Sequence, residues 1–267
     1  MRRKWGDSLR IAAISDLHIG AYARTDAFGH EEEDFLAFLD HLEATHDRIV
    51  LLGDIYQTDH ALIPSRRGRR THLSRARART ARLTERFSSG RYHYVHGNHD
   101  EIARETLGAK EVLVVSHKGR KAVFLHGHQF DPIWQRTETL ARSATWFSGS
   151  LRMLGLSAVA ARLEWHDVAL KHRRFGGAEG PYAEGARSLL ERYEAHFIVL
   201  GHTHVPFHYT LPEGEILNTG TCSNKMRMYV SIDLEVGSVA QEILSPSPRQ
   251  GRSLPAPLRK LREGEAL

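Results

Sequence analysis

The sequence has almost no cysteine and no long apolar stretch. Its single cysteine, Cys222, excludes an intramolecular disulfide framework and the cysteine-rich zinc modules. No apolar run approaches the roughly 18 residues that a membrane-spanning helix needs. The first seven residues are basic but lack the apolar stretch of a secretory signal peptide. We therefore expect a soluble, cytoplasmic protein without a transmembrane segment.

The overall composition is that of an ordinary globular protein, apart from its histidines. Hydrophobic residues make up 41% and charged residues 26% of the 267 residues, which excludes global disorder. The 37 Lys and Arg exceed the 32 Asp and Glu, and the net charge of +5 is compatible with a phosphate-bearing partner. The sequence contains 18 His, and histidine is the commonest metal ligand in proteins.

Short apolar runs alternate with helical patterns along most of the chain. The predicted strands are 11–14, 49–52, 92–95, 112–115, 122–125 and 197–200. Because short continuous apolar runs suit strands that are covered on both faces, we expect an α/β fold. We assign residues 1–244 to one domain. Residues 245–267 contain four prolines and several arginines, and we expect a C-terminal surface arm there.

Residues 132–180 interrupt this alternation. They are rich in large apolar side chains and predict two or three short helices inserted between two strands. One interpretation is a helical layer that packs on the sheet. The other is a lid over a site, with exposed aromatic side chains that contact a substrate. The pattern leaves both interpretations open.

Five short polar segments each follow a predicted strand or apolar run. They are Asp16-Leu17-His18, Gly53-Asp54, Gly97-Asn98-His99-Asp100, His126-Gly127-His128 and Gly201-His202-Thr203-His204. In an extended segment, side chains two positions apart lie on the same side, so each Asp-x-His or His-x-His pair can reach one ion. Because open α/β sheets carry their sites at the carboxyl ends of strands, we expect these segments to meet.

In this order, the five segments resemble the DxH, GD, GNH(D/E), H and GHxH motifs of the calcineurin-like metallophosphoesterase superfamily. The resemblance extends from Asp16 to His204, roughly three quarters of the chain, and implies a four-layer α/β/β/α sandwich. The insertion lies where the bacterial UDP-2,3-diacylglucosamine diphosphatases carry a helical lid, and residues 126–131 resemble their HGDxxD element. The chain therefore resembles that branch most closely.

The resemblance implies a centre of two divalent metal ions. Oxygen and imidazole donors would hold them, with Asp16, His18 and His204 on the first ion, Asn98, His126 and His202 on the second, and Asp54 bridging both. Such ligands, without thiolate, suit Mn²⁺, the ion that we expect, and also Fe or Zn²⁺. Two ions clamp a phosphate and activate a shared water, so that a bridging hydroxide attacks phosphorus in line with the leaving group.

Three further residues have expected roles beside the ions. The resemblance places His99 next to the substrate phosphate, where it stabilises charge or protonates the leaving oxygen. Asp100 would orient His99 through a hydrogen bond, or cap a helix, or do both. His128 is ambiguous, because the first histidine of the pair is the ligand in relatives, and we expect it near the substrate.

The substrate stays open at this point. This chain has His99 where the lipid A enzymes have Arg, and His128 where they have Asp. The candidates are a nucleotide-sugar lipid of the UDP-diacylglucosamine type, a nucleic acid, and a small nucleotide or phosphomonoester. All of them imply hydrolysis of a phosphoric ester or pyrophosphate bond. A non-catalytic scaffold with the same fold is the alternative from another class, but such relatives usually lose metal ligands and this chain keeps the full set.

Arginine is concentrated between residues 66 and 86, which contain nine Arg and one acid. A first group is predicted to form a loop that binds the non-reacting part of a phosphorylated substrate: Arg66, Arg67, Arg69 and Arg70. A second group recurs on one face of a predicted helix: Arg75, Arg79, Arg82 and Arg86. That face is either only solvated or contacts a polyanion, namely nucleic acid or anionic lipid head groups. The lipid alternative would place the protein peripherally on a membrane.

Overall fold

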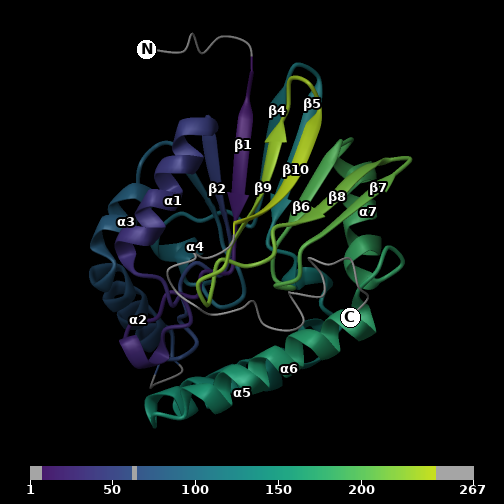
Figure 1. Ribbon diagram of the computed structural model, residues 1–267. Coiled ribbons are helices and arrows are strands. Elements are labelled where there is room, and N and C mark those ends of the chain that lie inside the picture. The colour runs from purple at the N-terminus through teal and green to yellow at the C-terminus, as the bar shows by residue number, and fades with distance from the viewer. Residues whose placement is uncertain (1–7, 62–64, 245–267) are drawn as a thin grey trace.

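Two five-stranded β-sheets form the centre of the protein in a computed structural model that describes residues 8–61 and 65–244 (Figure 1). The first sheet has the order β10-β9-β1-β2-β3, with β1 (Arg10–Ile14), β2 (Arg48–Leu52), β3 (Tyr92–Val95), β9 (Arg227–Asp233) and β10 (Ser238–Leu244). The second has the order β4-β5-β6-β8-β7, with β4 (Val112–His117), β5 (Arg120–Leu125), β6 (Phe197–Leu200), β7 (Phe207–Leu211) and β8 (Gly214–Asn218). All six predicted strands are present.

The two sheets pack face to face through alternate residues of each strand. Ile11 and Ala13 of β1 join the core between the sheets, where they meet Phe124 and Val199 of the second sheet. Ala12 and Ile14, on the opposite face of β1, belong to a second core on the outer face of its sheet. Because both faces of these strands are covered, their sequences read as continuous apolar runs rather than as an alternation.

Helices cover the outer face of each sheet. Beside the first sheet lie α1 (Glu32–Thr45), α2 (Arg66–Arg79) and α3 (Ala81–Phe87), and on the second sheet lies α7 (Pro181–Tyr193) (Figure 1). A short α4 (Ala103–Thr106) follows β3, and the 3₁₀ turns η1 (Ala23–Thr25) and η2 (His128–Phe130) lie in loops. This arrangement confirms the predicted four-layer α/β/β/α sandwich.

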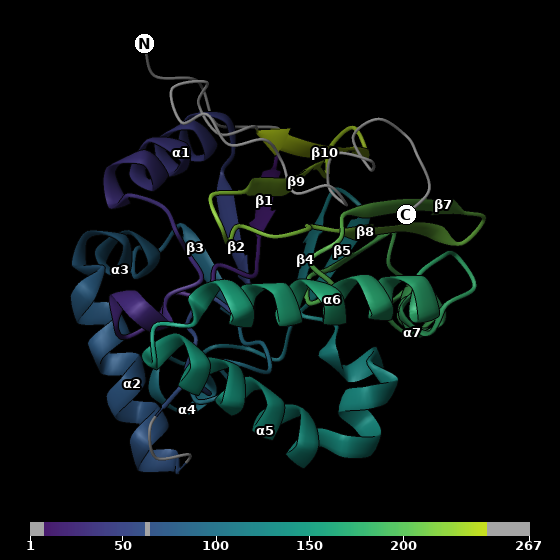
Figure 2. The same ribbon diagram turned by 60° about the horizontal axis from the view of Figure 1, so that its bottom comes forward.

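The inserted segment forms α5 (Pro132–Met153), which is broken near its start by a non-helical Thr137 (φ −141°, ψ 42°), and α6 (Ser157–Phe175). Most of it is therefore in two helices longer than the two or three short ones expected. They lie side by side and cross the edge of the sandwich where β1 and β2 end (Figures 1 and 2). The insertion is therefore not a layer on a sheet face. Asp131 caps α5 by accepting hydrogen bonds from the backbone N–H groups of Ile133 and Trp134 at 2.8 and 3.2 Å.

Among the described residues, no helix is both long enough and apolar enough to cross a lipid bilayer. The C-terminal arm expected over residues 245–267 lies outside the described residues.

Candidate metal centre

The five polar segments meet at one edge of the sandwich. Parallel strands of each sheet end there: β1, β2 and β3 in the first sheet, β5 and β6 in the second (Figure 1). Three groups of side chains form at this edge, and within each group the ligand atoms lie within 4.8 Å of one another: Asp16, His18 and His204; Asp54, His126 and His202; His18, Asp54 and His99. Asp54 and His18 each belong to two groups, so the three groups form one continuous centre.

The closest approaches join a carboxylate to an imidazole. His204 Nε2 lies 3.1 Å from Asp16 Oδ1, and His126 Nε2 lies 3.1 Å from Asp54 Oδ2. Between these pairs, His18 Nε2 lies 3.1 Å from His204 Nε2. The pairs come from four different strand ends, those of β1, β2, β5 and β6, so the centre depends on the tertiary fold and not on any single loop.

The backbone at this edge adopts a conformation that L-residues rarely use. Asp16, His18, Asp54, His202 and His204 all have positive φ, between 51° and 69°. They make up five of the nine non-glycine residues with positive φ among those described. Each such residue costs of order 1–3 kcal/mol, and these conformations aim the five side chains toward the common centre.

Two glycines allow the loops to approach closely. A Cβ added at Gly53, which has φ +85°, would overlap the ring of His126. A Cβ added at Gly97 would overlap the carboxylate and the backbone nitrogen of Asp54. Both positions therefore need glycine for the two sheets to place their ligands side by side.

Neighbouring acceptors set the tautomer of three of the histidines. Nδ1 of His18 donates to Gln57 Oε1 at 3.0 Å, and Nδ1 of His126 donates to the Leu52 carbonyl at 2.8 Å. Nε2 of His202 donates to Asp131 Oδ2 at 2.9 Å. In each ring the other nitrogen is left to accept a metal ion.

Three ligand atoms at the centre are buried and have no hydrogen-bond partner among the described residues: Asp16 Oδ1, Asn98 Oδ1 and His126 Nε2. Buried polar atoms are nearly always satisfied, so three unpaired atoms within one cluster call for a ligand. Carboxylate and amide oxygens with imidazole nitrogens suit Mn²⁺, Fe or Zn²⁺. The residues present therefore fit divalent metal ions.

The electrostatics of the centre also favour cations. Burial opposes protonation of His126, but the Asp54 carboxylate outweighs it and raises the pKa of His126 to about 10. Burial likewise opposes protonation of His18, while Asp16 and Asp54 raise its pKa to about 9. Burial alone would raise the pKa of Asp54, yet His126 and His99 hold that pKa well below its usual value. The two carboxylates thus stay ionised and attract positive charge.

A family comparison fits this geometry. A model of the calcineurin-like phosphoesterases matches residues 9–206. The chain belongs to the calcineurin-like phosphoesterase family. None of the curated proteins matches it.

Solved structures of similar shape include three proteins of low identity. A predicted phosphoesterase from Streptococcus pneumoniae TIGR4 shares 17% identity over 90% of this chain and 91% of its own, with a TM-score of 0.44. Vacuolar Protein Sorting 29 from Cryptosporidium parvum shares 14% identity over 90% of this chain and 100% of its own, with a TM-score of 0.45. An archaeal phosphodiesterase shares 11% identity over 88% and 100%, with a TM-score of 0.42.

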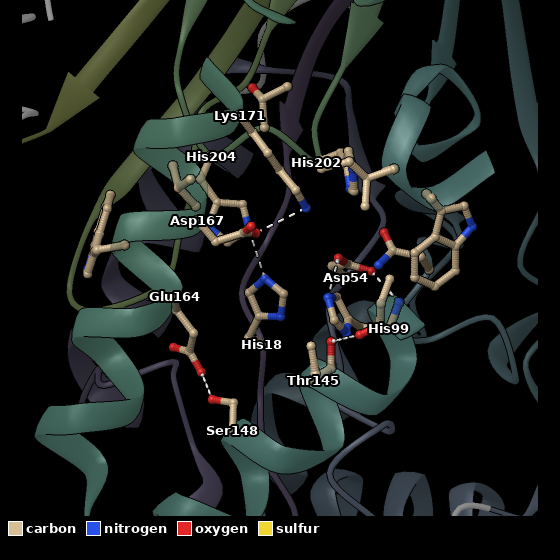
Figure 3. A pocket seen from close by; sticks show the side chains of 18 of the residues that line it. His18, Asp54, His99, Thr145, Ser148, Glu164, Asp167, Lys171, His202 and His204 are labelled. Atoms are coloured by element: carbon tan, nitrogen blue, oxygen red, sulfur yellow. Dashed lines mark hydrogen bonds and ion pairs between the residues drawn. The ribbon is translucent and has the colours of Figure 1, made fainter. Parts of the chain in front are cut away.

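A cavity of about 510 Å³ opens onto the candidate metal centre of this protein (Figure 3). His18, Asp54, His99, His202 and His204 line one side of it. Side chains of α5 and α6 line the other side, and from α6 Lys171 reaches toward the centre (Figure 3). The inserted helices thus form a wall of the site, and they contribute apolar as well as charged groups.

Asp100 does not orient His99, contrary to our expectation. Its carboxylate accepts hydrogen bonds from the backbone N–H of Ile55 at 2.7 Å and of Gly97 at 2.7 Å, and from the hydroxyl of Tyr94. It does not cap a helix either, because α4 begins at Ala103 after an Ile102 N-cap. Asp100 instead joins the loop after β3 to the loop after β2, which fixes the backbone beside Asp54.

The carboxylate beside His99 belongs to Asp59, a residue that the sequence reasoning missed. Asp59 Oδ2 lies 3.6 Å from His99 Nδ1. The same carboxylate pairs with Arg69 and with Arg142 of α5, each at 3.3 Å. Asp59 therefore connects His99 to an inserted helix. Asp131 and Gln57 were missed as well, although an Asp directly before Pro132 is a signal for a helix start.

The first arginine group forms the start of a helix and not the expected loop. Ser65 caps α2 by accepting a hydrogen bond from the Gly68 N–H at 3.1 Å, and α2 begins at Arg66. Arg66 and Arg70 both pair with Glu105. Neither these two nor Arg67 and Arg69 line the cavity. His128 does not line it either; its ring packs against His126 and Trp134, with centroids 5.7 and 6.0 Å apart.

The second arginine group does not share one continuous helix. The helical pattern breaks at Thr80, which has φ −117° and ψ 55°, so α2 ends and α3 begins there. Each guanidinium then faces a group of the same chain. The pairs are Arg75 with the Tyr22 hydroxyl, Arg79 with Asp26, Arg82 with Glu33, and Arg86 with Asp40 and Glu43.

Proposed function

We propose that this protein is a dinuclear-metal-dependent phosphoesterase that hydrolyses a phosphodiester or pyrophosphate bond. The observation that carries the proposal is that three ligand atoms, Asp16 Oδ1, Asn98 Oδ1 and His126 Nε2, are buried without a hydrogen-bond partner among the described residues. They lie beside a cavity that Asn98, Asp54 and His204 line. Asp54 belongs to the group with His126 and His202 and also to the group with His18 and His99, which supports its proposed role as the shared ligand. Membership of the calcineurin-like phosphoesterase family supports the same chemistry.

The residues at the site would have different roles in such a reaction. Asp16, His18 and His204 would hold one ion, with Asn98, His126 and His202 on the other, and Asp54 shared; Mn²⁺ is the first ion to test. Bound there, the ions would polarise the phosphoryl oxygens and lower the pKa of a water. His99 lines the cavity beside this group, with Nε2 3.8 Å from Asp54 Oδ2, where it can protonate the leaving oxygen.

The shape of the cavity favours a diester or pyrophosphate over a small monoester. A volume of about 510 Å³ falls within the range of sites for drug-sized ligands and exceeds what one phosphate fills. Lys171, held 3.0 Å from Asp167 and 3.5 Å from Asp131, provides a cation on the wall opposite the strand ends. A second phosphate of a pyrophosphate could accept its hydrogen bonds.

An amphiphilic substrate, such as a nucleotide-sugar lipid of the UDP-diacylglucosamine type, is the finer candidate that we favour. Leu140, Phe147 and Leu163 line the cavity and are still 68%, 55% and 51% exposed. Acyl chains would cover this apolar surface. A nucleic acid is less favoured, because Arg79, Arg82 and Arg86, which would contact a polyanion, face acids of the same chain.

Hydrolysis of bis-p-nitrophenyl phosphate in Mn²⁺ tests the proposal. Asp54→Asn should abolish activity, because it removes the charge shared by both ligand groups. His99→Ala should lower kcat by about 10²–10⁴-fold, the usual contribution of a general acid. His41→Ala, on an exposed position of α1, is the matched control and should retain full activity. Wild-type activity in both site variants, or none in wild type with any divalent ion, would overturn the proposal.

A further inference from the structure

Exposed apolar side chains gather on the hairpin formed by α5 and α6. Of the ten large hydrophobic residues that are exposed among those described, eight lie between residues 140 and 170. The other two, Val114 and Val236, lie on β4 and in the turn before β10. The hairpin lies at the outer boundary of the described chain, and no other helix or strand of residues 8–61 and 65–244 covers the side that faces away from the sheets (Figures 1 and 2).

The cavity accounts for only part of this apolar surface. Trp146, Leu154, Leu156, Val159 and Leu170 do not line it. Leu154 is 76% exposed and Leu156 is 46% exposed, and they flank the glycine turn at the tip of the hairpin. We call these five residues the docking face. An apolar surface of this kind, concentrated on one element, marks an interaction site.

Basic residues accompany the docking face. Residues 132–175 contain seven Lys and Arg and three Asp and Glu. Arg162, Arg173 and Arg174 are exposed, and none forms an ion pair with an acid in the described part of the chain. In contrast, Arg82 and Arg86 of α3 face acids of α1. The exposed cations of the hairpin that pair with no described acid are these three arginines of α6 and Arg136 near the start of α5.

We propose that the docking face binds the surface of a lipid bilayer that contains anionic lipids, with the tip of the hairpin inserted between head groups. Helices that lie in a membrane interface combine an apolar side with Lys and Arg, and an aromatic residue such as Trp146 suits the head-group level. A second copy of the chain fits less well. A twofold dimer through this face would place one positively charged hairpin against another.

Docking in this orientation would hold the cavity mouth at the lipid interface, because Leu140, Phe147 and Leu163 continue the apolar surface from the hairpin into the cavity. An amphiphile could then reach the strand ends without crossing water. That consequence rests on the proposed function, whereas binding of the bilayer does not, and the two can fail separately.

Co-sedimentation with vesicles tests the inference with the full chain. Wild type should bind vesicles of phosphatidylcholine and phosphatidylglycerol and bind vesicles of phosphatidylcholine alone weakly. Leu154→Ser with Leu156→Ser should weaken binding at least about tenfold, since burying each leucine contributes strongly. Replacing Arg162, Arg173 and Arg174 by Gln should weaken binding to the anionic vesicles by roughly fivefold for each charge.

The matched control is Val114→Ser with Val236→Ser, two exposed valines outside the hairpin. It should bind like wild type. Unchanged hydrolysis of bis-p-nitrophenyl phosphate and unchanged thermal unfolding show that each variant is folded. Three results would each overturn the inference: no binding of anionic vesicles by wild type, equal loss in the tip and control variants, or a wild-type dimer in sedimentation velocity that the tip variant dissociates.

Discussion

Removal of divalent ions should lower the thermal stability of this phosphoesterase by several degrees. The prediction follows from Asp16 Oδ1, Asn98 Oδ1 and His126 Nε2, which are buried without a hydrogen-bond partner among the described residues. A buried polar atom without a partner costs about 1–3 kcal/mol, so ions that satisfy all three atoms should stabilise the folded state by about 3–9 kcal/mol. The lower end is the safer expectation, because His126 and Asp16 also lie in ion pairs.

A stabilisation of about 3 kcal/mol is easily measured. In a protein of this size, 1 kcal/mol shifts Tm by roughly 2–4 °C, so chelation should lower Tm by about 6–12 °C. Linkage requires free ion on the order of 100-fold above Kd to reach this gain. The assay is calorimetry of chelator-dialysed protein during a titration with Mn²⁺, at constant pH and ionic strength.

Two variants make the result specific to the centre. His126→Gln should lose most of the ion-dependent rise in Tm, because it removes a buried ligand atom. His41→Gln, on an exposed position of α1, should keep the whole rise. A wild-type Tm that no divalent ion changes would refute the reasoning, as would an equal rise in both variants.

Three further perturbations act on neighbouring groups. Asp59→Asn should lower kcat about 10–100-fold with little change in KM, as loss of an outer partner does, and steady-state kinetics in which only KM changes would contradict this role. In the metal-free protein the pKa values of His18 and His126 rise from 6.5 to about 9 and about 10; their contribution is therefore complete below pH 6.5 and lost as the pH rises toward 10, so Tm should fall across that range. Gly97→Ala should destabilise the protein by roughly 1–3 kcal/mol through overlap, while Gly90→Ala, whose Cβ would meet nothing within 4 Å, should be near neutral in denaturant unfolding.

The strands and the meeting of the polar segments could be predicted because both depend on local pattern. Each predicted strand is a short apolar run, and the residue that follows the run must leave the sheet at its edge. Parallel strands end at the same edge, so Asp16, Asp54 and Asn98 had to come together once the strands were parallel. The spacing of two residues within Asp16-Leu17-His18 needs no long-range information either.

The partners of these ligands depend on tertiary placement, which the pattern does not contain. Asp100 is the sequence neighbour of His99, yet its side chain turns toward the loop after β2 and binds backbone N–H groups. Asp59 follows Asp54 by five positions after β2, whereas His99 lies in the loop after β3. Asp59 nevertheless lies beside His99. Adjacency in sequence therefore pointed to the wrong carboxylate as the neighbour of His99, because the direction of a side chain in a turn depends on φ and ψ and on the surrounding donors.

The arginines and the inserted helices show the same limit at the surface. The sequence pattern predicted one helix with a single arginine face: Arg75, Arg79, Arg82 and Arg86. In the structure the helix breaks at Thr80, and Arg82 and Arg86 form ion pairs with acids of α1. The apolar side chains of α5 and α6 would ordinarily indicate that each helix buries one face in a protein core. The hairpin crosses the edge of the sandwich and packs on it over only part of its length, with a cavity beneath the rest, so much of its apolar surface remains exposed. Periodicity predicts which side of a helix is apolar, whereas the elements packed around it decide whether that side meets a core, a ligand or a membrane.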